Sequence, residues 1–94
     1  MNSADYMTTY YLGLIYEKIG NYRNTIFYLI DTIEKNSTFE KAYIKLGEIF
    51  LVKNEFEKAH KYLMKVYSMN PYNSDTLNNL GLCCLNMGDE TRAI

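Results

Sequence analysis

The sequence predicts an all-α protein in which helix-turn-helix units stack into an α-solenoid. The first observation is a repeat, because the dipeptide Leu-Gly occurs at Leu12-Gly13, Leu46-Gly47 and Leu80-Gly81, at a constant interval of 34 residues. The second is that the apolar residues around each pair follow the 3.6-residue period of a helix, and no alternating strand pattern competes with it. A helical period of this length is typical of two-helix repeats that stack on one another.

This interval divides the 94-residue chain into a lead-in at residues 1–5, a first repeat at 6–39, a second at 40–73 and a partial third at 74–94. In the first helix of each repeat, apolar positions at i, i+3, i+4 and i+7 form one stripe. The stripes are Thr9, Leu12, Gly13 and Tyr16; Tyr43, Leu46, Gly47 and Phe50; and Leu77, Leu80, Gly81 and Cys84. A glycine inside a helix costs about 1 kcal/mol relative to alanine, so we expect each one to admit a neighbouring helix.

A turn is expected at the end of each first helix, at Gly20, Asn54 and Gly88. Glycine and asparagine both tolerate the left-handed backbone conformation that closes a helix. A second apolar stripe begins after the turn, at Tyr22 in the first repeat and at Phe56 in the second. In the third repeat the sequence stops as this stripe begins. We therefore expect antiparallel helix hairpins of about 14 residues per helix, with the last hairpin cut short.

These residues resemble the tetratricopeptide repeat (TPR) family over about nine-tenths of the chain. The second repeat carries the family pattern most fully, with Tyr43-x-x-Leu46-Gly47-x-x-Phe50, Phe56-x-x-Ala59, Leu63 and Pro71. The third matches from Asn79 to Ile94, and the first departs most, with Thr25 and Thr32 at positions that are usually small and apolar. The resemblance implies a right-handed solenoid. Because the third repeat is incomplete, we interpret the chain as a fragment of a longer TPR-containing protein.

Composition argues against several classes of function. The net charge of −1 provides no basic excess for binding nucleic acid or an anionic membrane. No apolar run approaches the roughly 20 residues needed to cross a bilayer, and residues 1–5 lack the features of a secretory signal. The adjacent pair Cys83-Cys84 is no disulfide framework. We therefore expect a cytoplasmic protein.

The sequence also lacks a set of residues suited to catalysis or to metal binding. His60 is the single histidine, so no pair of imidazoles is available for a metal or a catalytic triad. The helical pattern places it at the edge of a packing face. Cys84 lies on the apolar stripe and Cys83 beside it, and we interpret both as small buried apolar residues. We expect no enzyme activity, no metal and no cofactor.

The resemblance implies a binding surface, because the first helices of such arrays line a concave side that holds an extended peptide or a partner helix. Offsets from the repeated glycine give the candidate residues: Tyr10, Leu14, Glu17, Lys18, Lys41, Ile44, Glu48, Leu51, Val52, Asn78, Leu82, Leu85 and Asn86. About half are apolar although they lie off the packing stripe, and an apolar patch of this kind favours a ligand. We predict that a protein partner supplies an apolar or mixed peptide.

One subtype of the family is disfavoured. Members that bind acidic chaperone tails hold a carboxylate with lysine and asparagine one helical turn apart, where this chain has Tyr10 and Leu14. The third repeat offers Asp75, Asn78 and Asn79 instead of basic residues. Without these clamp residues, recognition of an acidic chaperone tail is not expected.

Two alternative functions remain open. The chain could be a structural or self-assembling segment of a multi-protein complex, because Leu77, Leu80 and Cys84 lose their cover if no second helix follows. Such a face favours self-association into a homo-oligomer or exchange of the last helix between two copies. The array could also be the docking arm of an enzyme whose catalytic domain lies elsewhere.

Overall fold

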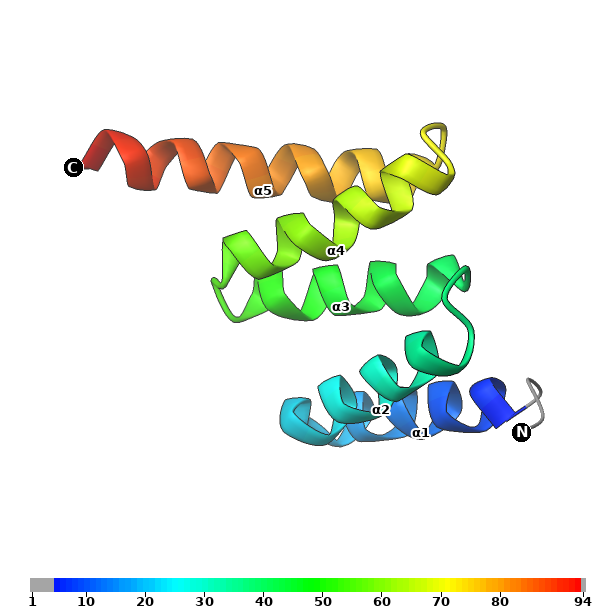
Figure 1. The fold of residues 1–94 in the computed structure, drawn as a ribbon. Helices are drawn as coiled ribbons and strands as arrows, with labels where there is room; N and C mark the ends of the chain where they lie inside the picture. The colour runs from blue at the N-terminus through cyan, green and yellow to red at the C-terminus, as the bar shows by residue number, and fades with distance from the viewer. Residues whose placement is uncertain (1–4, 94) are drawn as a thin grey trace. The chain divides into compact units, whose positions relative to one another are not determined.

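The chain is entirely helical over the part that the structure describes. A computed structural model describes the backbone of residues 5–93 and the side chains of residues 5–88. Within this range the helices are α1 (Asp5–Ile19), α2 (Tyr22–Lys35), α3 (Glu40–Val52), α4 (Phe56–Met69) and α5 (Ser74–Ala93) (Figure 1). The predicted all-α fold of helix-turn-helix repeats is confirmed. The chain forms two compact units, Met1–Ala42 and Tyr43–Ile94, and each is described by itself.

The turns inside the two complete hairpins have the same geometry, as the 34-residue interval predicts. Gly20 has a φ of 89° and Asn54 a φ of 61°, so both lie in the left-handed region. After α1, the amide of Gly20 donates to the carbonyl of Glu17 and that of Asn21 to the carbonyl of Tyr16. After α3, the amides of residues 54 and 55 make the equivalent bonds to the carbonyls of residues 51 and 50. Each helix therefore ends in a Schellman motif, which satisfies its last carbonyl groups.

The segments that leave the second helices also repeat. The side chain of Asn36 accepts a hydrogen bond from the amide of Thr38 at 3.2 Å, and that of Asn70 accepts one from the amide of Tyr72 at 3.3 Å. Such Asx turns give the backbone an alternative to continuing the helix. Asn73 then caps α5 by accepting a hydrogen bond from the amide of Thr76 at 3.1 Å.

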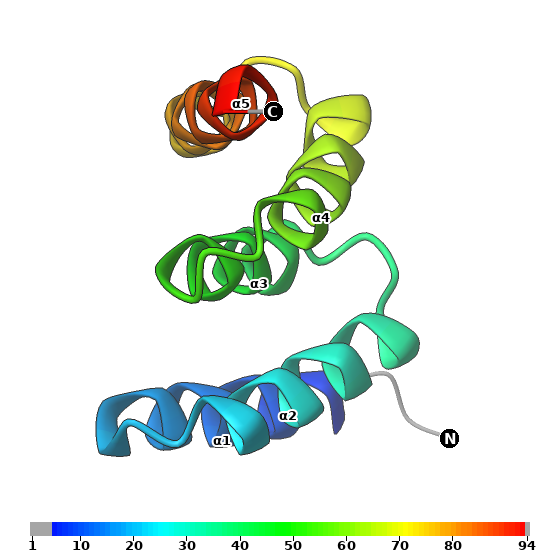
Figure 2. The ribbon, with the colours of Figure 1, turned by 90° about the vertical axis from the view of Figure 1, so that its left-hand side faces the viewer.

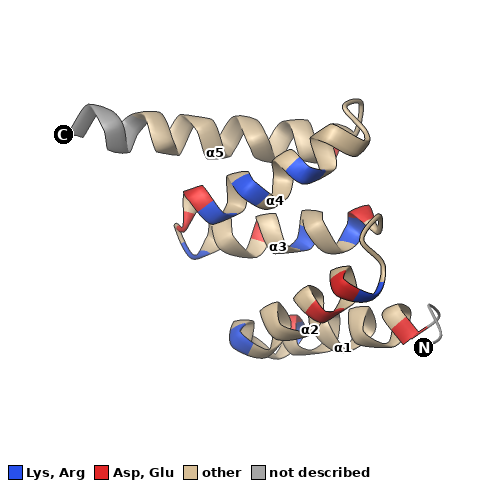
Figure 3. Cartoon of the chain, viewed as in Figure 1, with Lys and Arg blue, Asp and Glu red and all other residues tan. Residues whose placement is uncertain are grey.

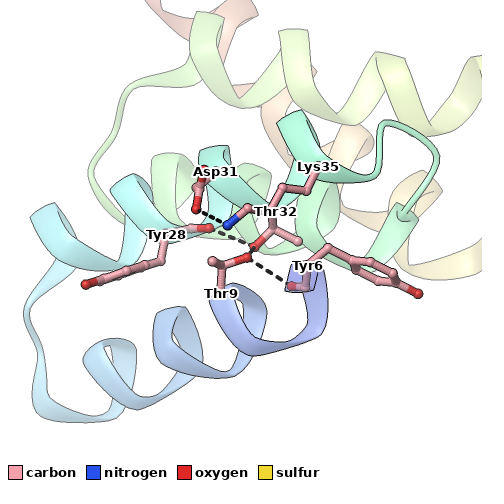
Figure 4. A network of polar contacts seen from close by, with 6 residues as sticks. All are labelled: Tyr6, Thr9, Tyr28, Asp31, Thr32 and Lys35. Atoms are coloured by element: carbon pink, nitrogen blue, oxygen red, sulfur yellow. Dashed lines mark hydrogen bonds and ion pairs between the residues drawn. The ribbon is translucent and has the colours of Figure 1, made fainter. Parts of the chain in front are cut away.

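The core of the first unit holds α2 against α1 through an apolar contact and a polar one. Leu29 is fully buried beside Gly13, where an added methyl group would lie 3.2 Å from the leucine Cγ. The polar contact joins Thr9 and Thr32, whose hydroxyl oxygens lie 2.8 Å apart (Figure 4). These hydroxyls also lie 3.0 and 2.7 Å from the carbonyl oxygens of residues 6 and 28 of their own helices. The threonine at position 32, unusual for the family, is therefore satisfied by a second threonine.

The second unit repeats this contact without the polar pair. Leu63 on α4 is fully buried against Gly47 on α3. The ring of Phe50 stacks on that of Tyr62 at a centroid distance of 5.8 Å, just as Tyr16 stacks on Tyr28 at 5.6 Å in the first unit. Both views show α4 lying against α3 and α5 (Figures 1 and 2).

The last helix packs on α4 through a different face from the predicted stripe. Thr76, Asn79 and Cys83 are buried, whereas Leu77 is 46% exposed and Cys84 is exposed. The thiol of Cys83 donates to the carbonyl of Phe56 at 3.0 Å. The prediction that Cys84 is buried is therefore wrong, and the one for Cys83 is confirmed. The two faces differ because α5 meets the preceding helix through one side, while its Leu-Gly stripe lies on the other.

The predicted turn at Gly88 is also wrong. The helix α5 continues through this residue to Ala93, and Gly88 is not among the residues with a positive φ. The turns at Gly20 and Asn54 each precede a helix that packs back on the first, whereas only residues 89–94 follow Gly88. Glycine is permissive in either conformation, so without a returning helix the hydrogen-bonded ladder simply continues.

Candidate protein-binding surface

One predicted contact residue on α1 is misplaced. Tyr10 is buried, with 8% of its surface exposed, and its ring meets the ring of Phe39 edge-on at 5.0 Å. The segment that follows α2 supplies this aromatic partner, so Tyr10 belongs to the core of its unit and is withdrawn from the candidate surface. Leu14 and Glu17 are half-buried and Lys18 is exposed.

The candidates on α3 form a largely apolar row. Ile44, Glu48 and Leu51 follow one another at i, i+4 and i+7, and all are half-buried, so each keeps a surface that a ligand could contact. Val52, in the last turn, is 66% exposed. Lys41, in the first turn, is exposed, and Glu48 lies 3.6 Å from Lys45 in an ion pair.

The candidates on α5 are exposed throughout. Leu82 is 47% and Leu85 69% exposed. Asn78 and Asn86 are exposed on the same side, and the amide of Asn86 donates to the carbonyl of Leu82 at 2.8 Å. Two large apolar side chains in solvent, one turn apart, are the most accessible part of the predicted site.

Helices α3 and α5 belong to the same compact unit. They run in the same direction, and α4 packs against both (Figure 1). Charge is scarce on α5, where Asp75 is the single charged residue among those at 74–88 (Figure 3). The chemistry that this part of the unit offers is therefore dispersive contact with apolar groups, joined by the amides of two asparagines.

A second apolar surface was only partly anticipated. The sequence predicts that Leu77, Leu80 and Cys84 lack cover, and the structure confirms exposure of Leu77 and Cys84, whereas Leu80 is half-buried. Sequence reasoning missed the exposed row of Tyr11, Ile15 and Ile19 on α1. The signal was available, because Ile15 lies one interval before the buried Ile49 and two before the buried Cys83.

The described residues offer little for other chemistries. Among them, no group of three or more histidine, cysteine or acidic side chains is placed to hold a metal ion. Within the same range no helix combines the length and the apolar character required to span a bilayer. His60 is half-buried on α4, as its position in the stripe predicts.

Comparison with known proteins assigns the class. Residues 40–73 and residues 62–94 each match the tetratricopeptide repeat family, and together they cover more than half of the chain. The chain belongs to the tetratricopeptide repeat family. Repeats of this family are typically protein–protein interaction modules.

A curated relative extends the comparison. The chain is 30% identical over 88 residues to the BBSome complex member BBS4 of Bos taurus. The match covers 94% of this chain and 17% of the relative, so the chain spans about a sixth of the length of the protein that it resembles. That relative is, by name, a subunit of a multi-protein complex.

Proposed function

We propose that this chain is a non-catalytic protein-binding module, located in the cytoplasm, that holds an apolar or mixed peptide or helix against its first-type helices. The single observation that carries the proposal is the exposure of Leu82 and Leu85 on the uncharged side of α5. Exposed neighbouring leucines are stabilised when a partner removes them from water, by about 25 cal/mol per Å² of apolar area.

The proposed site comprises twelve of the predicted residues, without Tyr10: Leu14, Glu17, Lys18, Lys41, Ile44, Glu48, Leu51, Val52, Asn78, Leu82, Leu85 and Asn86. We further propose repeats at residues 6–39, 40–73 and 74–94, after a lead-in at 1–5. The recurrence of Gly13, Gly47 and Gly81 at one interval supports these boundaries.

The test is selection of peptides from a displayed random library by the immobilised chain, followed by binding measurements on the peptides that are enriched. We expect enriched sequences to be apolar or mixed, and the double variant Leu82→Asp/Leu85→Asp to bind them at least tenfold more weakly. Both side chains are exposed, so the circular dichroism of the variant should be unchanged. Enrichment of acidic C-terminal tails, with loss of binding in Lys18→Ala or Lys41→Ala, would contradict the proposal.

The second candidate is a structural segment of a multi-protein complex, and it rests on the similarity to a protein named as a complex member. The two functions differ in the number of surfaces they require. A peptide-binding module loses its partner when the α5 leucines are changed, whereas a structural segment also needs other faces, including the exposed row Tyr11, Ile15 and Ile19. A variant with Ile15→Asp separates them, because it should leave peptide binding intact.

A further inference from the structure

The repeated glycine is occupied in two hairpins and open in the third. At Gly13 an added methyl group would meet Leu29 at 3.2 Å, and at Gly47 it would meet Leu63 at 2.6 Å. At Gly81 it would meet no atom of the described residues within 4 Å. The helix α5 therefore presents the same glycine in the same register, without the leucine that covers the other two.

The residues around Gly81 repeat the neighbourhood of an occupied glycine. Three positions after Gly13 and Gly47 stand Tyr16 and Phe50, each stacked on a tyrosine of the second helix. Three positions after Gly81 stands Cys84, which is exposed. Because cysteine is much smaller than an aromatic residue, the third position leaves more room for a side chain opposite it.

The opposite side of α5 is already in use. Thr76, Asn79 and Cys83 are buried where α5 packs on α4. Leu77, Leu80, Gly81 and Cys84 lie on the other side, and we call these four residues the Gly81 face. Leu77 is 46% exposed, and no charged side chain lies in this face, so a polar ligand would find no ion-pair partner there.

The two occupied faces define what fits. Both covering helices carry a small residue, then a tyrosine three positions later and a leucine four positions later: Thr25-x-x-Tyr28-Leu29 on α2 and Ala59-x-x-Tyr62-Leu63 on α4. The small residue and the leucine are fully buried in both cases. This pattern is an amphipathic helix whose leucine fills the notch above a glycine.

We propose that the Gly81 face is a second docking site, separate from the proposed peptide-binding surface, and that its ligand is an amphipathic helix with the pattern small-x-x-large-Leu. The leucine of that helix lies on Gly81, and the large residue before it lies over Cys84. Its polar side faces solvent, as the exposed Lys61 and Lys65 of α4 do. Continuity of the internal repeat carries this assignment, because the same receptor surface binds the same kind of helix twice in this chain.

The probe is a synthetic peptide of residues 55–70, which contains the α4 pattern, titrated into the 94-residue chain. A peptide of this length is a marginal helix in water, so the expected signature is a rise in helicity on binding together with a saturable heat. The matched peptide with Leu63→Asp should bind at least tenfold more weakly. Absence of binding by the unchanged peptide would overturn the proposal.

Variants of the chain locate the site. Gly81→Leu fills the notch, and because it meets no neighbour the chain should fold normally and bind the peptide at least tenfold more weakly. Leu82→Asp lies on the proposed peptide-binding surface and should leave capture of this probe unchanged, so failure of one site is distinguishable from failure of the other. Unchanged binding in Gly81→Leu would show that the probe docks elsewhere, which contradicts the proposal.

Cys84 supplies an independent readout. Its thiol is exposed, whereas Cys83 is buried, so a bulky maleimide should modify Cys84 and block the probe. The variant Cys84→Ser should bind the probe both before and after maleimide treatment. Sedimentation of the chain alone completes the test: a monomer is expected, and a dimer that the probe cannot dissociate would mean that a second copy covers the face, against the proposal.

Discussion

Leu63 of α4 fills the space above Gly47 of α3 so closely that a methyl group at position 47 would lie 2.6 Å from the leucine Cγ and Cδ2. This contact explains why a glycine stands in the middle of a helix. The cost in helix propensity, about 1 kcal/mol, is offset by burial of a whole leucine side chain, which contributes about 1.5 to 3 kcal/mol.

The same substitution should therefore have opposite effects at equivalent positions. Gly47→Ala forces Leu63 out of its place and should lower the free energy of unfolding by about 1 to 3 kcal/mol. Gly81→Ala meets no described neighbour and should raise it by up to about 1 kcal/mol through helix propensity. Urea denaturation of both variants and the parent chain measures the difference. Equal effects at the two positions would mean that the third glycine is covered like the second.

A second prediction concerns the hairpin turns. Gly20 has a φ of 89°, a conformation that costs a residue with a side chain about 1 to 2 kcal/mol. Gly20→Ala should destabilise the first hairpin by that amount, as thermal unfolding would show. Gly88→Ala is the matched control, because Gly88 lies within α5 and should gain stability from alanine. Destabilisation of both variants to a similar degree would argue that Gly88 also forms a turn.

A third prediction concerns the buried threonine pair of the first unit. One interval later the pair is replaced by Tyr43 and Val66, which are both buried, so the contact is polar in one repeat and apolar in the next. Thr9→Val should cost about 1 kcal/mol, since Thr32 loses a buried partner. The double variant Thr9→Val/Thr32→Val should recover part of this loss, with a coupling energy of about 0.5 to 1.5 kcal/mol in a double-mutant cycle. Strict additivity would contradict a direct hydrogen bond between them.

A fourth prediction follows from the thiol between α4 and α5. Burial raises the pKa of Cys83, and the neighbouring Cys84 raises it further. The folded state therefore keeps the thiol proton while the unfolded chain begins to lose it near pH 8.5. The stability that this group contributes is complete below that pH and is lost as the pH rises towards the raised value of the folded chain. Urea midpoints between pH 7.5 and 9.5 should fall less steeply in Cys83→Ala than in Cys84→Ala. An identical slope in the two variants would exclude a role for Cys83.

Features that depend on local sequence were predictable. The turns at Gly20 and Asn54 could be read from the chain because a left-handed residue after an apolar stripe closes a helix whatever the tertiary surroundings. The pairing of Gly13 and Gly47 with a second helix was predictable for a similar reason, since glycine in a helix has few other uses.

Features that depend on neighbours were not predictable. The burial of Tyr10 requires the ring of Phe39, which a helical pattern in α1 cannot reveal. The buried side of α5 is set by the preceding helix, so periodicity alone chose the wrong cysteine. At Gly88 the conformation depends on whether a returning helix is present, because the residue itself permits both outcomes.

The central claim is that the exposed apolar rows of α3 and α5 hold a protein ligand. The most direct measurement is the amide chemical-shift change in the isotope-labelled chain on addition of a peptide selected from the displayed library. We predict that the largest changes fall on Ile44, Leu51, Leu82 and Leu85. Changes confined to the outer side of α4, at Lys61 and Lys65, with none on α3 or α5, would contradict the claim.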